Sequence, residues 1–411
     1  MHNGARILAQ ADDLARFTED PACLTRTYLT AQHKLAGQYV IGLMQAAGMT
    51  AQFDALGNVV GRYAAADPAA PTVMTGSHID SVRNAGRYDG IFGILSPIAC
   101  VADLHRRGKR LPYNLEVVAF GDEEGVRFGL TLIGSKAIAG AFDPAWLEKT
   151  DADGITLRQA VSDFGGDPDA WPTLDRHGKL AAYLESHIEQ GPVLLNEGLA
   201  VGVVTAIAGA TRSQIAVTGL AGHAGTVPMS ARQDALAAAA EMVLAVEGRC
   251  ARVPGLVGTV GRMQVLPGAI NVIPQDVEFT IDVRSGDDSI RESAVVDLDQ
   301  EFIEIARRRN VRVQSAQFHR ASAAPCHAGL QQVIGTAIAA QGLPVRHLPS
   351  GAGHDAMAFP ALCPTGMLFV RCGNNGISHH PDETMTAEDA DLATQVLLRA
   401  FEALDPVQLP R

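Results

Sequence analysis

Apolar runs in the first part of the chain alternate with segments of helical periodicity. Residues 72–75 predict a strand that leads into His78, residues 91–104 predict a helix, and residues 115–120 predict a second, buried strand. Strand, loop, helix and strand in this order are typical of an α/β sheet covered on both faces. Ligands of such sheets gather beyond the carboxyl ends of the strands.

The middle of the chain has a different pattern. Residues 213–218 and 277–283 alternate strictly between apolar and polar positions, as in strands with one wet face. Helical stretches at 234–246 and 289–308 flank the second of these strands. This segregation predicts a small α+β domain with its helices on one side of an antiparallel sheet.

The last part returns to the first style. It predicts a helix over 330–340, a strand over 366–370, and a final helix capped by Thr386 with Asp389 three residues later. We expect these elements to complete the α/β domain.

Composition narrows the class of protein. A chain of 411 residues exceeds the usual size of one domain, so two domains are expected. The formal net charge of −12 argues against a nucleic-acid or anionic membrane surface as partner. No apolar run approaches the roughly 18 residues that span a bilayer.

Location is predicted from the N-terminus and the cysteines. Residues 1–13 lack a basic segment followed by an apolar stretch, so no secretory signal is visible. No two cysteines have the CxxC spacing of zinc or redox motifs, which favours reduced thiols in the cytoplasm. The cysteines are Cys23, Cys100, Cys250, Cys326, Cys363 and Cys372.

Acidic and histidine side chains stand where the predicted strands end or in loops. Three consecutive carboxylates after an apolar strand repel one another unless a cation neutralises them, and a pair of divalent ions would do so. Imidazole and carboxylate ligands suit Zn²⁺, and carboxylate-rich sets also accept Mn²⁺ or Co²⁺. The side chains are His78, Asp80, Asp89, Asp122, Glu123, Glu124, His187, His379 and His380.

Each piece alone has an ordinary interpretation. An HxD pair occurs often by chance, an acidic run is usually a solvated turn, and His379 with His380 can simply cap a loop. In the HxD pair both side chains share one face of the strand, so the Asp80 carboxylate can hold the His78 imidazole.

Seven ordered stretches together resemble one family. Between about residues 75 and 383 the chain contains TGSHIDSVRNAGRYDGIFG, FGDEEGVRFG, ESHIEQGPVL, GLAGHAGTVPM, GAINVIP, SGAGHDA and GISHHPDE. These resemble the amidase/hydantoinase/carbamoylase branch of the M20 metallopeptidase-like superfamily. That branch contains N-carbamoyl-L-amino-acid hydrolases, β-ureidopropionases, allantoate amidohydrolases and ureidoglycolate amidohydrolases.

The resemblance implies a two-domain zinc-hydrolase fold. Residues 1–207 and 321–411 would form a mixed-sheet catalytic α/β domain that holds two divalent metal ions. Residues 208–320 would form an inserted α+β lid that also makes a homodimer.

The resemblance also assigns the metal ligands and the base. His78 and His187 would bind the first ion, Glu124 and His379 the second, and Asp89 would bridge both. Glu123 would be the general base. The family commonly has Asn where this chain has His380, which leaves His379 and His380 as alternatives, with His379 preferred.

Further residues resemble the family's recognition groups. Arg284 would bind the substrate carboxylate with two parallel hydrogen bonds. His223 would stabilise the oxyanion of the tetrahedral intermediate. The other residues placed in the substrate pocket by resemblance are Gln190, Asn271, Gly353 and His354.

The expected activity is hydrolysis of the terminal ureido C–N bond of a small carboxylic acid. Allantoate is the first candidate substrate, narrowly ahead of N-carbamoyl-L-amino acids and β-ureidopropionate. A dipeptidase of the wider superfamily is a more remote alternative. A non-catalytic binding protein is disfavoured because Glu123 and Asp89 are both present.

Overall fold

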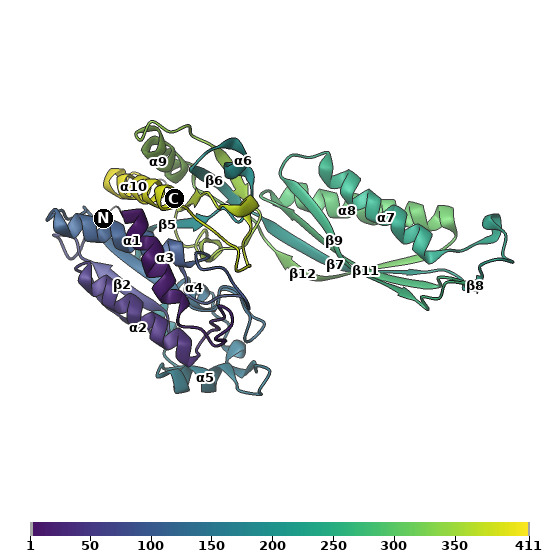
Figure 1. Cartoon of the computed structure of the whole chain (residues 1–411), viewed down its shortest axis with the longest axis horizontal. Coiled ribbons are helices and arrows are strands. Elements are labelled where there is room, and N and C mark those ends of the chain that lie inside the picture. The colour runs from purple at the N-terminus through teal and green to yellow at the C-terminus, as the bar shows by residue number, and fades with distance from the viewer. Residues whose placement is uncertain (1–2, 410–411) are drawn as a thin grey trace. The chain divides into compact units, whose positions relative to one another are not determined.

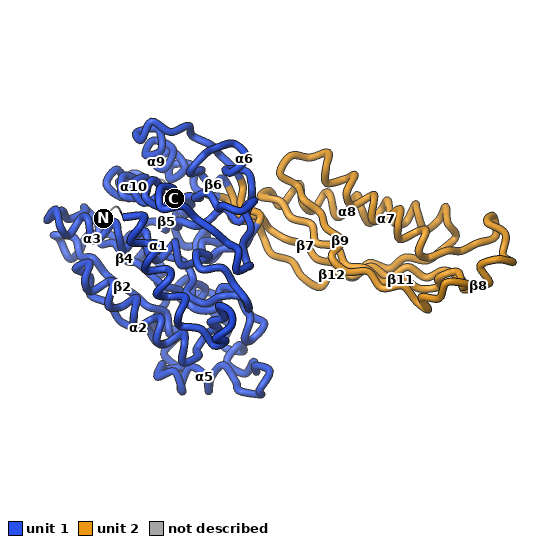
Figure 2. Tube along the Cα trace, viewed as in Figure 1, with its two compact units in different colours: residues 1–205, 326–348, 352–411 blue, residues 206–325, 349–351 orange. Residues whose placement is uncertain are grey.

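The computed structural model describes residues 3–409 and divides into two compact units (Figure 2). Unit 1 comprises residues 3–205, Cys326–Leu348 and residues 352–409. Unit 2 comprises Ala206–Pro325 and Pro349–Gly351. Among the described residues, no helix has both the length and the apolar character needed to cross a membrane.

Unit 1 combines helices with most of a mixed sheet (Figure 1). Its helices are α1 (Asn3–Ala15), α2 (Ala31–Ala46), α3 (Ile91–Arg106), α4 (Ile133–Ile138), α5 (Leu157–Phe164), α6 (Val193–Glu197), α9 (Ala328–Ala339) and α10 (Ala387–Ala403), with 3₁₀ turns η1 (Pro144–Glu148), η2 (Trp171–Leu174), η4 (Asp355–Ala358) and η5 (Asn374–Gly376). The strands of the sheet are β1 (Thr50–Phe53), β2 (Val59–Tyr63), β3 (Thr72–His78), β4 (Asn114–Phe120), β5 (Leu180–Ile188), β6 (Val201–Ile207), β13 (Ala324–Pro325), β14 (His347–Ser350) and β15 (Thr365–Val370).

The sheet order is β1-β2-β4-β3-β5-β15-β6-β13, and β14 pairs with β6 outside this path. The central strands β4, β3, β5 and β15 run parallel, whereas β1, β2, β6 and β13 pair antiparallel with their neighbours. All residues of β4 and β15 are buried, as expected for central strands without a wet face. The α/β fold class with a mixed sheet is thus confirmed.

Helices α1, α3 and α10 pack on one another, and α3 and α10 also pack on the central strands. Twelve of the sixteen residues of α3 are buried, so this helix lies inside unit 1. The strand and helix after residue 330 are present as predicted, and the Thr386 side chain caps α10 by accepting from the Asp389 backbone N–H. This packing fixes the first turn of α3, directly after Asp89.

Unit 2 is a four-stranded antiparallel sheet with two long helices on it (Figure 1). Its elements are β7 (Gly209–Thr218), β8 (Gly222–His223), η3 (Met229–Ala231), α7 (Ala235–Ala251), β9 (Leu256–Leu266), β10 (Val272–Ile273), β11 (Asp276–Ser285), α8 (Asp288–Arg309) and β12 (Arg312–Ala321). The sheet order is β12-β7-β11-β9, and β8 pairs with β10 separately.

The alternation in β11 explains how this sheet faces its helices. Val277, Phe279, Ile281 and Val283 are buried in one cluster with apolar residues of α7 and α8, while the residues between them are more exposed. Asp234 and Asp287 cap the two helices by accepting from backbone N–H groups. The predicted antiparallel sheet with helices on one side is therefore present.

Candidate metal centre

The predicted ligands of unit 1 come together at the carboxyl ends of the parallel strands. His78 is the last residue of β3, His187 is the last but one of β5, and Glu124 follows β4 by four residues. Asp89 stands two residues before α3. Gly90, between them, has φ of 68°, and a Cβ there would lie 2.4 Å from the His78 backbone oxygen. Glycine at this position therefore lets the Asp89 loop approach β3 closely.

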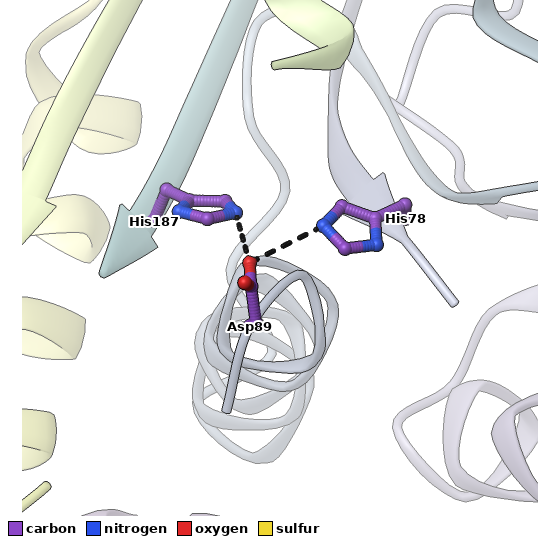
Figure 3. A group of neighbouring side chains, drawn as sticks. All are labelled: His78, Asp89 and His187. Carbon is purple, nitrogen blue, oxygen red and sulfur yellow. Dashed lines mark ion pairs between the residues drawn. The ribbon is translucent and has the colours of Figure 1, made fainter. Parts of the chain in front are cut away.

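Asp89 lies at the centre of the group, and its two carboxylate oxygens face different partners. Oδ1 lies 3.4 Å from Nε2 of His78 and 3.2 Å from Nε2 of His187 (Figure 3). Oδ2 lies 3.1 Å from Nε2 of His379, which in turn lies 3.4 Å from Oε1 of Glu124. Ligand atoms about 2.1 Å from a tetrahedral zinc ion lie roughly 3.4 Å apart, so both triads have the spacing of a metal site.

Two ring tautomers carry the case for a cation. Nδ1 of His78 lies 3.0 Å from the Asp80 carbonyl oxygen, and Nδ1 of His187 lies 2.9 Å from the Ile188 carbonyl oxygen. A carbonyl only accepts, so each Nδ1 holds a proton and each Nε2 of a neutral ring presents a lone pair. Both Nε2 atoms lie near Oδ1 of Asp89, a buried atom without a hydrogen-bond donor, and Nε2 of His187 also accepts from the Gly90 backbone N–H at 3.3 Å. An imidazole lone pair and a carboxylate oxygen repel each other, so either a proton or a metal ion must lie between them.

Electrostatics favour positive charge at this point. Burial by itself lowers the pKa of both histidines. Contact with Asp89 outweighs it, so the pKa of His78 lies well above its ordinary value and the pKa of His187 is also raised. Although its own burial acts the other way, contacts with the imidazoles hold the pKa of Asp89 well below its usual range. A divalent ion supplies the same positive charge to neutral rings.

Of the two neighbouring histidines, only His379 faces these groups. Its backbone has φ of 56°, a left-handed conformation that is rare for histidine. His380 instead accepts a hydrogen bond from the Asp382 backbone N–H at Nδ1 and lies 3.6 Å from the Asp382 carboxylate. The geometry therefore favours His379 as the ligand, as preferred from the sequence.

Glu123 and Glu124 are placed by Asp80. Their backbone N–H groups donate to Oδ1 and Oδ2 of Asp80, at 3.1 and 3.2 Å. The Asp80 carboxylate was expected to hold the His78 ring, but it lies 3.9 Å from Nδ1 of that ring, too far for a hydrogen bond. The backbone carbonyl of Asp80 holds the ring instead. Both carboxylate oxygens are already used by the neighbouring loop, which accounts for the difference.

Glu123 is half-buried close to the metal-binding group. Burial, together with the nearby Asp80, raises the pKa of Glu123 to about 7, against the opposing effect of His78. A carboxylate with a pKa near neutrality can take up and release a proton at physiological pH. A Cβ on Gly353 would lie 3.6 Å from Oε1 of Glu123, so this glycine borders the same carboxylate.

Gln190 and His354 also lie in this group. Nε2 of Gln190 donates to Oδ2 of Asp89 at 2.9 Å and to Oγ of Ser378 at 3.3 Å. The ring of His354 meets that of His187 edge-on, with centroids 4.4 Å apart. Burial, with a smaller contribution from the neighbouring His187, lowers the pKa of His354 well below its ordinary value.

The sequence pattern that describes peptidase family M20/M25/M40 matches residues 74–403 of this chain. This chain is a member of that family. It is 40% identical to the N-carbamoyl-L-amino acid amidohydrolase of Geobacillus stearothermophilus, over 97% of each chain. It is 38% identical to allantoate deiminase 1 of Glycine max, over 97% of this chain and 89% of that one.

The fold of this M20 chain matches a solved structure over its whole length. The amidase of the hydantoinase/carbamoylase family from Burkholderia multivorans superposes with a TM-score of 0.92 at 34% identity, over 98% of each chain. The branch of the superfamily predicted from the seven motifs is thereby confirmed.

The remaining predicted residues belong to unit 2 of the M20 chain, where they form two separate groups. His223 in β8 pairs with Val272 of β10, and the Asn271 carbonyl accepts from the Ala224 backbone N–H at 3.0 Å. Both His223 and Asn271 are exposed. Arg284 stands near the other end of β11, eight residues beyond Asp276. At about 3.3 Å per residue, the length of β11 separates the two groups by roughly 25 Å.

Arg284 is held in place by its own strand. Nε and Nη2 donate to the two carboxylate oxygens of Asp282 at 3.1 and 2.9 Å, and Nη1 donates to the Gly351 carbonyl at 3.0 Å. Arg212 also donates to Asp282, at 3.0 Å. One carboxylate thus faces two guanidinium groups, which leaves a net positive charge beside a cavity of about 500 Å³.

Two buried acids and one serine were missed from the sequence. Ser378 and Glu383 bond to the Asp89 loop, and Glu185 accepts from the Ser77 hydroxyl and the Ala356 backbone N–H. A signal for the first pair was present, because both stand in the stretch GISHHPDE. Glu185 lies inside β5, two residues before His187, and opens the stretch ESHIEQGPVL, so a signal was present for it as well.

Proposed function

We propose that this chain hydrolyses the terminal ureido C–N bond of a small carboxylic acid, with allantoate as the first candidate substrate. It is an amidohydrolase of the M20 family, and its relatives include N-carbamoyl-L-amino acid amidohydrolases and allantoate deiminases. The observation that carries the proposal is that Nε2 of His78 and Nε2 of His187 both face Oδ1 of buried Asp89, an atom that accepts no hydrogen bond.

We infer two divalent ions at this centre. His78, His187 and Asp89 would hold the first, and Asp89, Glu124 and His379 the second, since each set brings ligand atoms within 4.8 Å of one another. Zn²⁺, Mn²⁺ and Co²⁺ all suit this mixture of imidazole and carboxylate. Bound ions would polarise the ureido carbonyl and lower the pKa of a water.

The protein's own groups then move the proton. Glu123 would take a proton from the attacking water and return it to the leaving nitrogen. The Asp80 carboxylate accepts from the backbone N–H groups of both Glu123 and Glu124. It therefore fixes the position of the base Glu123 relative to the proposed ligand Glu124. Gln190, Gly353 and His354 would line the substrate side of the centre.

We further propose that recognition uses two chains of a homodimer. Arg284 would bind the substrate carboxylate, His223 would stabilise the oxyanion, and Asn271 would contact the substrate beside His223. A small ureido acid cannot bridge the roughly 25 Å between the two ends of β11, so one chain cannot supply both groups to one substrate. A lid and dimerisation domain over residues 208–320 would bring them from different chains.

N-carbamoyl-L-amino acids are the second candidate. The relative with this activity in its name is 40% identical, slightly more than the 38% of the soybean allantoate deiminase. We also propose the cytoplasmic location that the cysteine spacing of the sequence favours.

Ammonia release decides between the candidates. Purified protein reloaded with Mn²⁺, Zn²⁺ or Co²⁺ is assayed for ammonia release from allantoate, several N-carbamoyl-L-amino acids and β-ureidopropionate, and for release of free amino acids from a dipeptide, with metal content measured in parallel. We expect two ions per chain and turnover of at least one ureido acid. Cleavage of the dipeptide alone would refute the proposed function, and a metal content near zero in active protein would refute the metal centre.

A further inference from the structure

Glu383 connects two loops that are almost 300 residues apart in the chain. Its Oε1 accepts from the backbone N–H groups of Tyr88 and Asp89 at 2.7 and 3.2 Å. Its Oε2 lies 3.0 Å from the Ser378 hydroxyl. The residue is only 3% exposed, so these contacts form out of reach of bulk water.

Ser378 extends this connection to the side chain of Asp89. Its hydroxyl lies 2.8 Å from Oδ2 of Asp89, the oxygen that faces His379. Ser378 directly precedes His379, whose backbone is held in the left-handed region. Glu383 thus contacts the backbone of Asp89 directly. Through Ser378, which precedes His379, it is also connected to the Asp89 carboxylate.

The loop before Asp89 is shaped to receive this carboxylate. A Cβ built on Gly86 would lie 2.3 Å from Cδ of Glu383 and 2.4 Å from its Oε1. Gly86 has no positive φ that would require glycine. The absence of a side chain at residue 86 is therefore explained by the space that Glu383 occupies.

We infer that Glu383 is a positioning residue that fixes Asp89 and the Ser378–His379 loop for the second metal ion. It would act through hydrogen bonds to the backbone of Asp89 and to Ser378, without touching the ion or the substrate. The inference rests on the proposed metal centre but does not depend on the identity of the substrate. The first ion would be held by His78 and His187 together with Asp89, and would depend on this connection less.

The test measures metal binding as well as turnover. Metal-free protein is titrated with Mn²⁺ by calorimetry, and the two binding steps are compared among variants. Glu383→Ala should weaken one step by about 10–100-fold, the usual effect of losing a partner that orients a ligand, and leave the other within about threefold. In the loaded enzyme kcat should fall while KM stays within about threefold.

Glu383→Gln is the conservative variant. One amide oxygen can still accept from both backbone N–H groups, and the amide nitrogen can donate to Ser378, which then donates to Asp89. We expect Glu383→Gln to keep the affected step within about threefold of the wild-type affinity. A loss as large as that of Glu383→Ala would overturn the hydrogen-bond role.

Asp389→Asn provides a matched control for general destabilisation. Asp389 is another buried acid. Its side chain is hydrogen-bonded to Arg371 and to the Thr386 hydroxyl, away from the Asp89 loop. Its variant should lower the melting temperature but leave both Mn²⁺ steps unchanged. If Glu383→Ala does not fold, Ser378→Ala and Gly86→Ala replace it, with the same selective loss expected.

Unchanged affinity at both steps in folded Glu383→Ala, or equal losses at both, would overturn the inference. Failure of the proposed function is a separate result. A wild-type chain that binds two Mn²⁺ ions but cleaves no ureido acid would remove the substrate assignment while leaving the metal titrations to decide the role of Glu383.

Discussion

Replacing Arg284 tests whether the substrate carboxylate is bound in unit 2. Three of the five guanidinium N–H groups of Arg284 are used, two by Asp282 and one by the Gly351 carbonyl. Two N–H groups, one on each Nη, are left for an incoming carboxylate. Asp282 and Gly351 hold the plane of the guanidinium in advance, so little side-chain entropy is lost on binding.

The expected magnitude follows from exposure. Loss of a charge-assisted pair at a binding site costs on the order of 2–5 kcal/mol. The Arg284 side chain is 31% exposed, so water screens its attraction to the substrate carboxylate, and we expect a cost at the lower end of this range. About 2 kcal/mol corresponds to a rise of roughly 30-fold in KM for Arg284→Ala. Arg284→Lys should recover only part of this, because an ammonium cannot make the two-point contact.

The assay compares each ureido acid with its uncharged carboxamide analogue. For the wild type the acid should have the lower KM, and for Arg284→Ala this difference should disappear. Arg262→Ala removes a charge from the neighbouring strand β9, where Arg262 contacts Gln214 and not Asp282, and should change neither KM. Equal KM values for the acid in wild type and Arg284→Ala would refute carboxylate binding by Arg284.

Further predictions concern the base, the metal and the dimer. Glu123→Gln should keep both metal ions and lose about two to four orders of magnitude in kcat, since only proton transfer is removed, and near-normal turnover would place the base elsewhere. Burial raises the pKa of Glu124 to about 8 in the metal-free protein, so the stability it contributes is present at low pH and is lost as pH rises through that value. Glu124→Gln should therefore raise the melting temperature of the chelator-treated protein at about pH 8.5 and lower that of the metal-loaded protein, and thermal unfolding with and without Mn²⁺ checks both signs. In verified mixed dimers, Glu123→Gln combined with either His223→Ala or Arg284→Ala should recover activity in one of the two pairings, and recovery in neither would argue against shared sites.

Much of the fold could be predicted because local pattern and tertiary role agree. The alternation in residues 277–283 places Phe279 and Ile281 in the core of unit 2, so β11 was visible from the sequence. The edge strands β9 and β12 were not predicted. Most of their residues are exposed on both faces, so the burial that creates a period of two is absent.

The site was predictable to the extent that it depends on side-chain chemistry at strand ends. His78 and Glu124 stand at or just beyond the ends of parallel strands, where the topology gathers them. Glu383 was missed although it stands in the stretch GISHHPDE, because two of its partners are backbone N–H groups, which every residue except proline carries and which do not identify a partner in the sequence. Asp80 was singled out for its side chain facing His78, whereas the backbone carbonyl of Asp80 holds that ring.

Backbone strain adds an argument that the centre is built for a ligand. Asp122, Gln190 and His379 all have positive φ, and each stands beside or within the metal-binding group. Such conformations cost on the order of 1–3 kcal/mol each and persist only where surrounding contacts impose them. The Asp122 carbonyl accepts from the Leu132 backbone N–H at 2.7 Å, and the Gln190 backbone N–H lies 3.3 Å from the Cys372 sulfur. Because contacts outside the ligand set hold these loops in shape, the ligands are placed before any ion binds, and the free energy of metal binding is not consumed in ordering them.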